Sequence, residues 1–138
     1  MVETVYRSSS FQETINFGQK LGKTLNGGEL ILLTGVLGSG KTVITKGIAL
    51  ALGIKSIVTS PSFAIMNEYK GKLWLYHFDF YRIDDRQEME DLLEDYIYRK
   101  DGIAAIEWGE KVEGCLESYI RVDIDIDDLY RTIKVERR

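Results

Sequence analysis

The sequence predicts an α/β fold in which helices flank a mixed sheet that carries antiparallel hairpin additions. Three observations lead to this class. Apolar runs that fit strands alternate along the chain with segments of helical periodicity. The run at 30–34 (LILLT) is continuously apolar, as expected of a central strand covered on both faces. Near the C-terminus, residues 119–126 alternate apolar and charged side chains, which is typical of a strand with one face in water.

The N-terminal part of the chain predicts a strand, a helix and a second strand in turn. Residues 4–8 fit a short strand. Ser10, with Glu13 three residues later, forms the S-x-x-E capping box that satisfies free amide groups at a helix start. One helical face then carries Phe11, Ile15, Gly18, Leu21, Gly22 and Leu25. The segment 26–28 (NGG) predicts the end of this helix before the 30–34 strand.

The alternation continues through the rest of the chain. A glycine-rich loop at 35–40 leads into a helix from residue 41 to about residue 52, and Gly53 ends it. Asp85, with Glu88 three residues later, can cap a further helix that reaches about residue 98. The remaining strands are expected at 57–59, 63–69, 73–80, 103–106, 119–126 and 130–136, with hairpin turns at 70–72 and 127–128.

Length and composition limit the class of protein. The 138 residues predict a single domain over residues 1–138. With 18 Lys and Arg against 22 Asp and Glu, the net charge is -4, which argues against stand-alone nucleic-acid binding. The one cysteine, Cys115, excludes an internal disulfide, and no apolar run reaches the roughly 18–20 residues of a membrane span. We therefore expect a cytoplasmic protein without a signal peptide or a membrane segment.

A phosphate-binding motif follows the central strand. Residues 35–42 (GVLGSGKT) match the pattern G-x-x-x-x-G-K-[ST] at every fixed position. Glycines let backbone N–H groups converge on phosphate oxygens, and the helix that follows adds the positive end of its dipole. Lys41 is expected to reach the β- and γ-phosphates, and the Thr42 hydroxyl is expected to bind Mg²⁺. The predicted nucleotide-binding residues are Gly35, Leu37, Gly38, Ser39, Gly40, Lys41, Thr42 and Val43.

Two acids are candidates for holding Mg²⁺ or for orienting the attacking water. Asp79 follows the apolar run 73–78, and Glu107 follows the run 103–106. A carboxylate at the end of a strand near the phosphate loop is the arrangement that such a site needs. Both acids are therefore candidate catalytic residues and candidate metal ligands, and the choice between the two roles stays open.

Other polar and aromatic residues have simpler interpretations. His77, the sole histidine, is expected to be a structural residue in an aromatic strand. Cys115 is expected to be a buried or incidental thiol. Trp108 fits the core and an exposed binding position equally well. The remaining acids of this region are expected on the wet face of one helix: Asp84, Asp85, Glu88, Glu90, Asp91, Glu94 and Asp95.

Several segments of the chain together resemble one known family. They are 35–42, Ser60-Pro61-Ser62-Phe63, Asn67-Glu68-Tyr69, 77–82 (HFDFYR) and Glu107-Trp108-Gly109-Glu110, in this order. The set is similar to the TsaE (YjeE) family of tRNA threonylcarbamoyladenosine (t6A) biosynthesis, and the resemblance covers nearly the whole chain. The phosphate loop alone is generic, whereas the H-F-D-x-Y-R and E-W segments at these separations are specific.

The resemblance implies a small P-loop ATPase that uses ATP and Mg²⁺ and works with the TsaD and TsaB proteins. TsaD transfers the threonylcarbamoyl group to adenosine 37 of tRNA, so this chain would contact tRNA only indirectly, through the complex. By position, Lys41 and Thr42 match the phosphate and Mg²⁺ ligands, and Asp79 and Glu107 match the two acids of the family. Trp108 matches an aromatic residue that is important for activity. The segment that matches one likened to a GTPase switch is Ser60, Pro61, Ser62 and Phe63.

Three positions depart from the family pattern. Val36 stands where members usually carry Asp or Glu, so any polar role of that side chain is lost. Ser62 replaces the usual Thr and keeps the hydroxyl, and Gly109 replaces a common Pro. None of the three removes a phosphate or metal ligand.

Two other functions would use the same motif. In a nucleotide-gated adaptor, ATP binding rather than hydrolysis would matter, and the ligands would be identical. A small-molecule kinase is less favoured, because no arginine-rich lid segment is evident and the chain leaves little room for an acceptor pocket. A GTPase is disfavoured because the chain has no Asn-Lys-x-Asp segment. The leading hypothesis is an ATPase that is weak alone, with Arg82 as the best-placed arginine.

Overall fold

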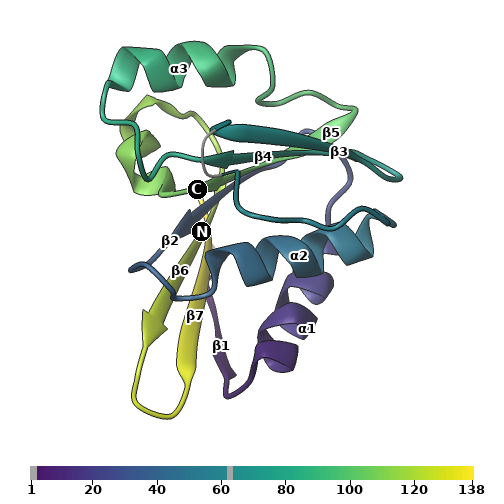
Figure 1. Ribbon diagram of the computed structural model, residues 1–138, viewed down its shortest axis with the longest axis vertical. Helices are drawn as coiled ribbons and strands as arrows, with labels where there is room; N and C mark the ends of the chain where they lie inside the picture. Colours follow the sequence, from purple (N-terminus) through teal and green to yellow (C-terminus); the bar gives the residue numbers. More distant parts are fainter. Residues whose placement is uncertain (1–2, 62–63) are drawn as a thin grey trace.

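The computed structural model describes residues 3–61 and 64–138 of the chain. In these residues seven strands form one sheet in the order β1-β7-β6-β2-β5-β4-β3 (Figure 1). The strands are β1 (Glu3–Ser8), β2 (Leu30–Thr34), β3 (Met66–Lys70), β4 (Trp74–Asp79), β5 (Gly102–Glu107), β6 (Ile120–Ile126) and β7 (Arg131–Arg137). The helices are α1 (Phe11–Gly22), α2 (Lys41–Ala51) and α3 (Arg86–Glu94), with two short 3-10 helices, η1 (Gly109–Lys111) and η2 (Glu113–Cys115).

The sheet is parallel at its centre and antiparallel at both sides. Strand β2 lies between β5 and β6 and is parallel to both, and β4 is parallel to β5. Strands β3 and β4, β6 and β7, and β1 and β7 pair in the antiparallel sense. All five residues of β2 are buried, as a central strand requires. The prediction of a mixed sheet with antiparallel hairpin additions is therefore confirmed.

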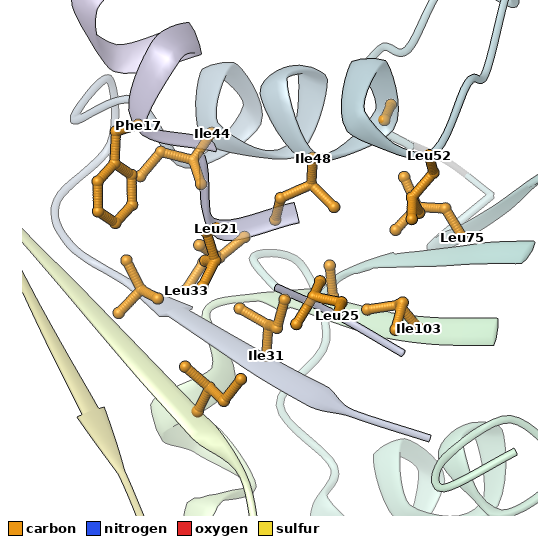
Figure 2. Close-up of a cluster of buried hydrophobic side chains, with 14 of the residues drawn as sticks. Phe17, Leu21, Leu25, Ile31, Leu33, Ile44, Ile48, Leu52, Leu75 and Ile103 are labelled. Carbon is orange, nitrogen blue, oxygen red and sulfur yellow. The ribbon is translucent and has the colours of Figure 1, made fainter. Parts of the chain in front are cut away.

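Helices cover both faces of the sheet. Ile31 and Leu33 of β2 face α1 and α2, in the apolar cluster that Figure 2 shows between α2 and the sheet. Their neighbours Leu30 and Leu32 face the opposite side, where Met89 and Leu93 of α3 contribute to a second cluster. Figure 1 shows α3 on the other side of the sheet from α1 and α2. Because successive strand residues point to opposite faces, one apolar strand supplies both cores.

Two glycines bring α1 and α2 into close contact. A Cβ atom on Gly18 of α1 would lie 2.3 Å from the carbonyl oxygen of Ile44. A Cβ atom on Gly47 of α2 would lie 2.3 Å from the carbonyl oxygen of Ile15. Both distances are far below van der Waals contact, so neither position accommodates a side chain. This packing fixes α2, whose first residue is Lys41, against the capped helix α1.

The first helix begins as predicted and ends earlier. The Ser10 hydroxyl accepts a hydrogen bond from the Glu13 N–H at 3.0 Å, while the Glu13 carboxylate accepts from the N–H of Ser9. The helix ends at Gly22 and not near residue 25, because the Thr24 hydroxyl donates to the Leu21 carbonyl and closes the last turn. Phe11, the first residue of the predicted apolar face, is 59% exposed.

Two predicted elements further along the chain also need correction. Residues 57–59 do not form a strand: the Thr59 N–H donates to the Tyr69 hydroxyl instead of to a neighbouring strand. Helix α3 ends at Glu94 and not near residue 98, because the N–H groups of Tyr96 and Ile97 both donate to the Leu93 carbonyl. The backbone of Tyr98 then takes a φ of 61°, which no helix can contain.

The remaining predictions agree with the structure to within a few residues. Asp85 caps α3 through the Glu88 N–H, and Glu88 and Glu94 are exposed, as the wet-face interpretation expected. The thiol of Cys115 is exposed and accepts from the Arg86 guanidinium at 2.8 Å. Strand β3 begins at Met66. The start of the predicted strand 63–69 lies outside the described residues. None of the helices formed by the described residues has the length and apolar character needed to cross a membrane.

Candidate functional site

The glycine-rich loop 35–40, called the phosphate loop below, joins the end of β2 to the start of α2. Gly40, the residue just before α2, has a φ of 118°, a conformation that side chains rarely allow. It supplies no side chain that could cap the helix, so the first N–H groups of α2 stay directed at the space in front of the loop. A helix start of this kind is a binding site for anions, because free N–H groups and the helix dipole favour negative charge there.

Lys41 lies folded back over the loop. Its Nζ donates to the carbonyl oxygens of Gly35 at 2.6 Å and Val36 at 3.0 Å. The same ammonium lies 4.2 Å from the centre of the Trp108 ring. Burial lowers the pKa of Lys41 from its usual range, and the carboxylates of Glu107, Glu110 and Asp79 partly oppose this shift. The carboxylates and the aromatic ring thus favour a charged lysine at the loop.

Glu107 is the central carboxylate of the site. Its Oε2 accepts a hydrogen bond from the Thr42 hydroxyl at 2.8 Å, and the same oxygen lies 2.6 Å from Nε2 of His77. His77 is fully buried and only 4% of Glu107 is exposed. The two side chains hold Glu107 at the end of β5 from two sides. His77 therefore belongs to the site, although the sequence predicted only a structural residue.

Asp79 lies beside Glu107 on the neighbouring parallel strand, where the two residues are register partners. Its Oδ2 accepts from the Ser60 hydroxyl at 2.7 Å, and its Oδ1 accepts from the N–H of Tyr81 at 3.0 Å. The expectation that both acids end strands next to the phosphate loop is met. Of the predicted switch segment, Ser60 contacts Asp79 and Pro61 is buried, whereas Ser62 and Phe63 lie outside the described residues.

These groups line one cleft of about 470 Å³ at the carboxyl ends of β2, β4 and β5. The residues that line it are Leu37, Gly38, Gly40, Lys41, Thr42, Val43, Ser60, Asp79, Tyr81, Arg82, Glu107 and Trp108. Gly35, Ser39 and Pro61 do not line it, and Ser39 is fully buried. The structure therefore brings most of the predicted site residues into one space.

Aromatic rings border the cleft on one side. Tyr81 is 48% exposed, and its ring centre lies 5.1 Å from that of Trp108. The backbone of Trp108 has a φ of 63°, in a region that bulky residues avoid. This conformation holds the indole ring over Lys41. Trp108 is thus a partly buried residue of the cleft wall rather than a core residue alone.

The oxygen atoms of the cleft fit Mg²⁺ bound together with phosphate. The Thr42 hydroxyl and the carboxylates of Glu107 and Asp79 are hard oxygen donors. No group of three or more His, Cys, Asp or Glu residues that could hold a metal alone occurs in the described part of the chain. Mg²⁺ commonly takes one or two carboxylates and completes its shell with water and substrate phosphates. The donor set therefore matches a metal that arrives with a nucleotide.

The strand–loop–helix unit, with acids at the ends of the adjacent strands, defines an α/β protein of the P-loop class. Residues 8–136 match the family model described as "Threonylcarbamoyl adenosine biosynthesis protein TsaE". The chain therefore belongs to the TsaE family, which acts in the biosynthesis of t6A in tRNA.

Individual relatives agree with this assignment. The chain is 39% identical over 112 residues to the tRNA threonylcarbamoyladenosine biosynthesis protein TsaE of Treponema pallidum, covering 81% of this chain and 83% of the relative. It is 36% identical over 134 residues to TsaE of Aquifex aeolicus, covering 94% and 92%. A crystal structure of Bacillus subtilis YdiB matches with a TM-score of 0.82 and 31% identity, covering 97% of this chain and 84% of that one.

Proposed function

We propose that this chain binds Mg-ATP in the cleft and hydrolyses it slowly, as the ATPase that drives or resets a TsaD–TsaB complex in t6A biosynthesis. One observation carries the proposal: Lys41, Thr42, Asp79 and Glu107 converge on the same cleft, with the Thr42 hydroxyl 2.8 Å from Glu107. A phosphate-binding lysine, a metal-binding hydroxyl and two acids are the groups that P-loop hydrolysis requires. Membership of the TsaE family supports the pathway.

The side chains suggest how the chemistry would proceed. The Lys41 ammonium, which now contacts two loop carbonyls, would turn to the β- and γ-phosphates of the nucleotide. When bound, Mg²⁺ would offset negative charge on the transferring phosphoryl group. Thr42 and one of the two acids would hold the metal ion. The other acid would orient a water molecule in line with the bond that breaks.

A nucleotide-gated adaptor is the second candidate, and the contact of Ser60 with Asp79 favours it. Asp79 lines the cleft, so a nucleotide that binds its carboxylate, directly or through a metal, would compete with the Ser60 hydroxyl. Loss of this hydrogen bond would release Ser60 and the adjoining Pro61 from Asp79 without any ATP hydrolysis. An adaptor would then present a different surface to its partner in the nucleotide-bound state.

Calorimetry tests the assignment of the site. ATP and GTP are titrated into the wild type and into Lys41→Ala, with and without TsaB and TsaD. We expect ATP binding by the wild type and at least a tenfold loss of affinity in Lys41→Ala, because the variant removes a cation that lines the cleft beside the phosphate loop. Lys46→Ala, which removes a lysine from the same helix, is the matched control. Equal ATP affinity in the wild type and Lys41→Ala would contradict the site.

A further inference from the structure

Arg131 links the last hairpin of the sheet to the phosphate loop. Its Nε donates to the carbonyl oxygen of Ser39 at 2.6 Å, and its Nη2 donates to that of Gly38 at 3.3 Å. A Cβ atom on Gly40 would lie 3.7 Å from the same Nε, so the guanidinium also packs against Gly40. In Figure 1 the loop between β2 and α2 lies beside the β6–β7 hairpin that carries Arg131.

Arg131 donates its hydrogen bonds to backbone carbonyls, although several carboxylates are near it in the sequence. Asp125, Asp127 and Asp128 all lie in or next to the same hairpin turn. No carboxylate of the described residues nevertheless lies within ion-pair distance of Arg131. The guanidinium instead donates to two backbone carbonyls of the loop. Carbonyls are weaker partners than carboxylates, so the geometry selects the loop over the nearby acids.

The backbone of Arg131 is held by neighbouring strands on both sides. Arg131 pairs with Ile126 of β6 and with Ser8 of β1, so its backbone lies between two strands. The turn before it is closed by a hydrogen bond from the Asp127 N–H to the Tyr130 carbonyl at 2.8 Å. Because the backbone of Arg131 is fixed in the sheet, its guanidinium can hold the loop in place.

The two hydrogen bonds determine how the loop peptides point. In a trans peptide the C=O and the following N–H point in opposite directions. Arg131 donates a hydrogen bond to the Ser39 carbonyl, which directs the N–H of Gly40 away from Arg131. The N–H of Ser39 is already used, since it donates to the Val36 carbonyl at 3.0 Å. In the part of the chain that the structure describes, the Gly40 N–H has no acceptor, and Gly40 lines the cleft.

We propose that Arg131 is a positioning residue for the phosphate loop: it holds the Ser39–Gly40 peptide so that the Gly40 N–H binds a phosphate of a nucleoside di- or triphosphate. Arg131 itself lies behind the loop and does not line the cleft. The positive charge behind the peptide also increases the attraction of the Gly40 N–H for an anion. The inference rests on the proposed nucleotide binding and deepens it, because it adds a residue distant in sequence from the motif.

The test compares Arg131→Ala, Arg131→Lys and the control Lys134→Ala, which removes a positive charge from an exposed position of the same strand. Affinities for ATP and for ADP are measured by calorimetry, and the melting temperature is measured without nucleotide. We expect Arg131→Ala to weaken both affinities about tenfold, since a charged hydrogen bond of this kind is lost. Lys134→Ala should stay within about twofold. Arg131→Lys should fall between them, because an ammonium lacks the planar fork that reaches both carbonyls.

Steady-state kinetics separates positioning from a merely structural role. In Arg131→Ala the KM for ATP should rise about tenfold while kcat stays within about threefold, because Arg131 touches no reacting atom. A fall in kcat at unchanged KM would overturn the inference. So would nucleotide affinities of Arg131→Ala that equal those of Lys134→Ala. If Arg131→Ala does not fold, Arg131→Lys decides: wild-type affinity for both nucleotides overturns the inference, and weakened affinity at an unchanged melting temperature supports it.

Failure of this inference is distinct from failure of the proposed function. A wild-type protein that binds neither ATP nor ADP would overturn the proposed function and the inference with it. A wild type that binds ATP, with Arg131 variants that bind it equally well, would overturn the inference alone.

Discussion

At the scale of single residues, Glu107 concentrates the contacts of the site. One oxygen, Oε2, is shared by the Thr42 hydroxyl and the His77 ring, so the orientation of the carboxylate is fixed without a ligand. Each of the two roles open to Glu107, metal ligand or water-orienting group, depends on its negative charge. An amide at this position keeps the size and loses the charge.

We therefore expect Glu107→Gln to lower ATP turnover at least about 100-fold while ATP affinity changes by less than about fivefold. Turnover is measured by phosphate release and affinity by calorimetry. Glu94→Gln, at an exposed acid of α3 that does not line the cleft, should keep near wild-type turnover. Turnover in Glu107→Gln above a third of the wild-type rate would contradict the role. If t6A formation survives the loss of hydrolysis, the adaptor is favoured over the ATPase.

His77 makes a second prediction at this scale. It is fully buried, its Nε2 contacts Glu107, and its Nδ1 has no hydrogen-bond partner within the described residues. Replacement by alanine leaves a cavity and removes one contact of a buried carboxylate. We expect His77→Ala to lower the free energy of unfolding by about 2–4 kcal/mol, measured by urea denaturation. Leu50→Ala, at a position that is 53% exposed, is the control, and equal losses in the two variants would count against the assignment.

The positions of site residues could be predicted where a short motif determines them. The eight residues 35–42 are contiguous, so their pattern indicated Lys41 and Thr42 directly. Asp79 and Glu107 were predicted because each ends an apolar run. The contacts of His77 and Arg131 depend on how separate strands align, which no local pattern records. The one signal for His77 was its position two residues before Asp79, on the same face of the strand.

At the scale of elements, the placement of α2 depends on its packing against α1. Strong apolar patterns predicted β2 and β5 correctly, because a strand buried on both faces is apolar throughout. The ends of α1 and α3 were predicted less well. They are set by the Thr24 hydroxyl and by the turn before Tyr98, which compete with helical periodicity. Sequence periodicity thus shows that an element exists more reliably than where it stops.

The contact between α1 and α2 predicts the effect of a single methyl group. In a free helix Gly47→Ala would be favourable by about 1 kcal/mol. Here the new Cβ would lie 2.3 Å from the Ile15 carbonyl oxygen and 2.9 Å from the Gly18 Cα, both backbone atoms that cannot rotate away. We expect the steric overlap of the new Cβ to outweigh the gain in helix propensity. The free energy of unfolding, measured by urea denaturation, should then fall by about 1–3 kcal/mol. Leu50→Ala on the same helix is the control, and a Gly47→Ala variant more stable than the wild type would contradict the packing.

At the scale of the whole molecule, the sheet topology assembles the site. Strands β4, β5 and β2 are parallel neighbours, so their carboxyl ends bring Asp79, Glu107 and the phosphate loop to one edge. A mixed sheet was predictable from the order of the elements. The strand order itself was not, because adjacency in the sheet depends on contacts between segments far apart in sequence.

Among the residues that the structure describes, Arg82 is the one arginine that lines the cleft, and exposed apolar side chains of the loop border it. Val36 is 63% exposed and Leu37 is 67% exposed. A partner that covered this edge would bury apolar surface and exclude water from the nucleotide. It could also supply a further cation, and a cation supplied in this way raises P-loop hydrolysis by about 10³–10⁵ in known cases.

We therefore expect ATP turnover by this chain to rise at least about tenfold when TsaB and TsaD are added together. Phosphate release is measured for the chain alone, for the two partners alone and for all three. Lys41→Ala with both partners is the matched control, because it leaves the exposed Val36 and Leu37 in place and removes the lysine proposed to bind phosphate. If the isolated chain already turns over ATP as fast as the mixture, its cleft is catalytically complete without a partner. The proposed coupling would then fail, although ATP binding and the fold would stand.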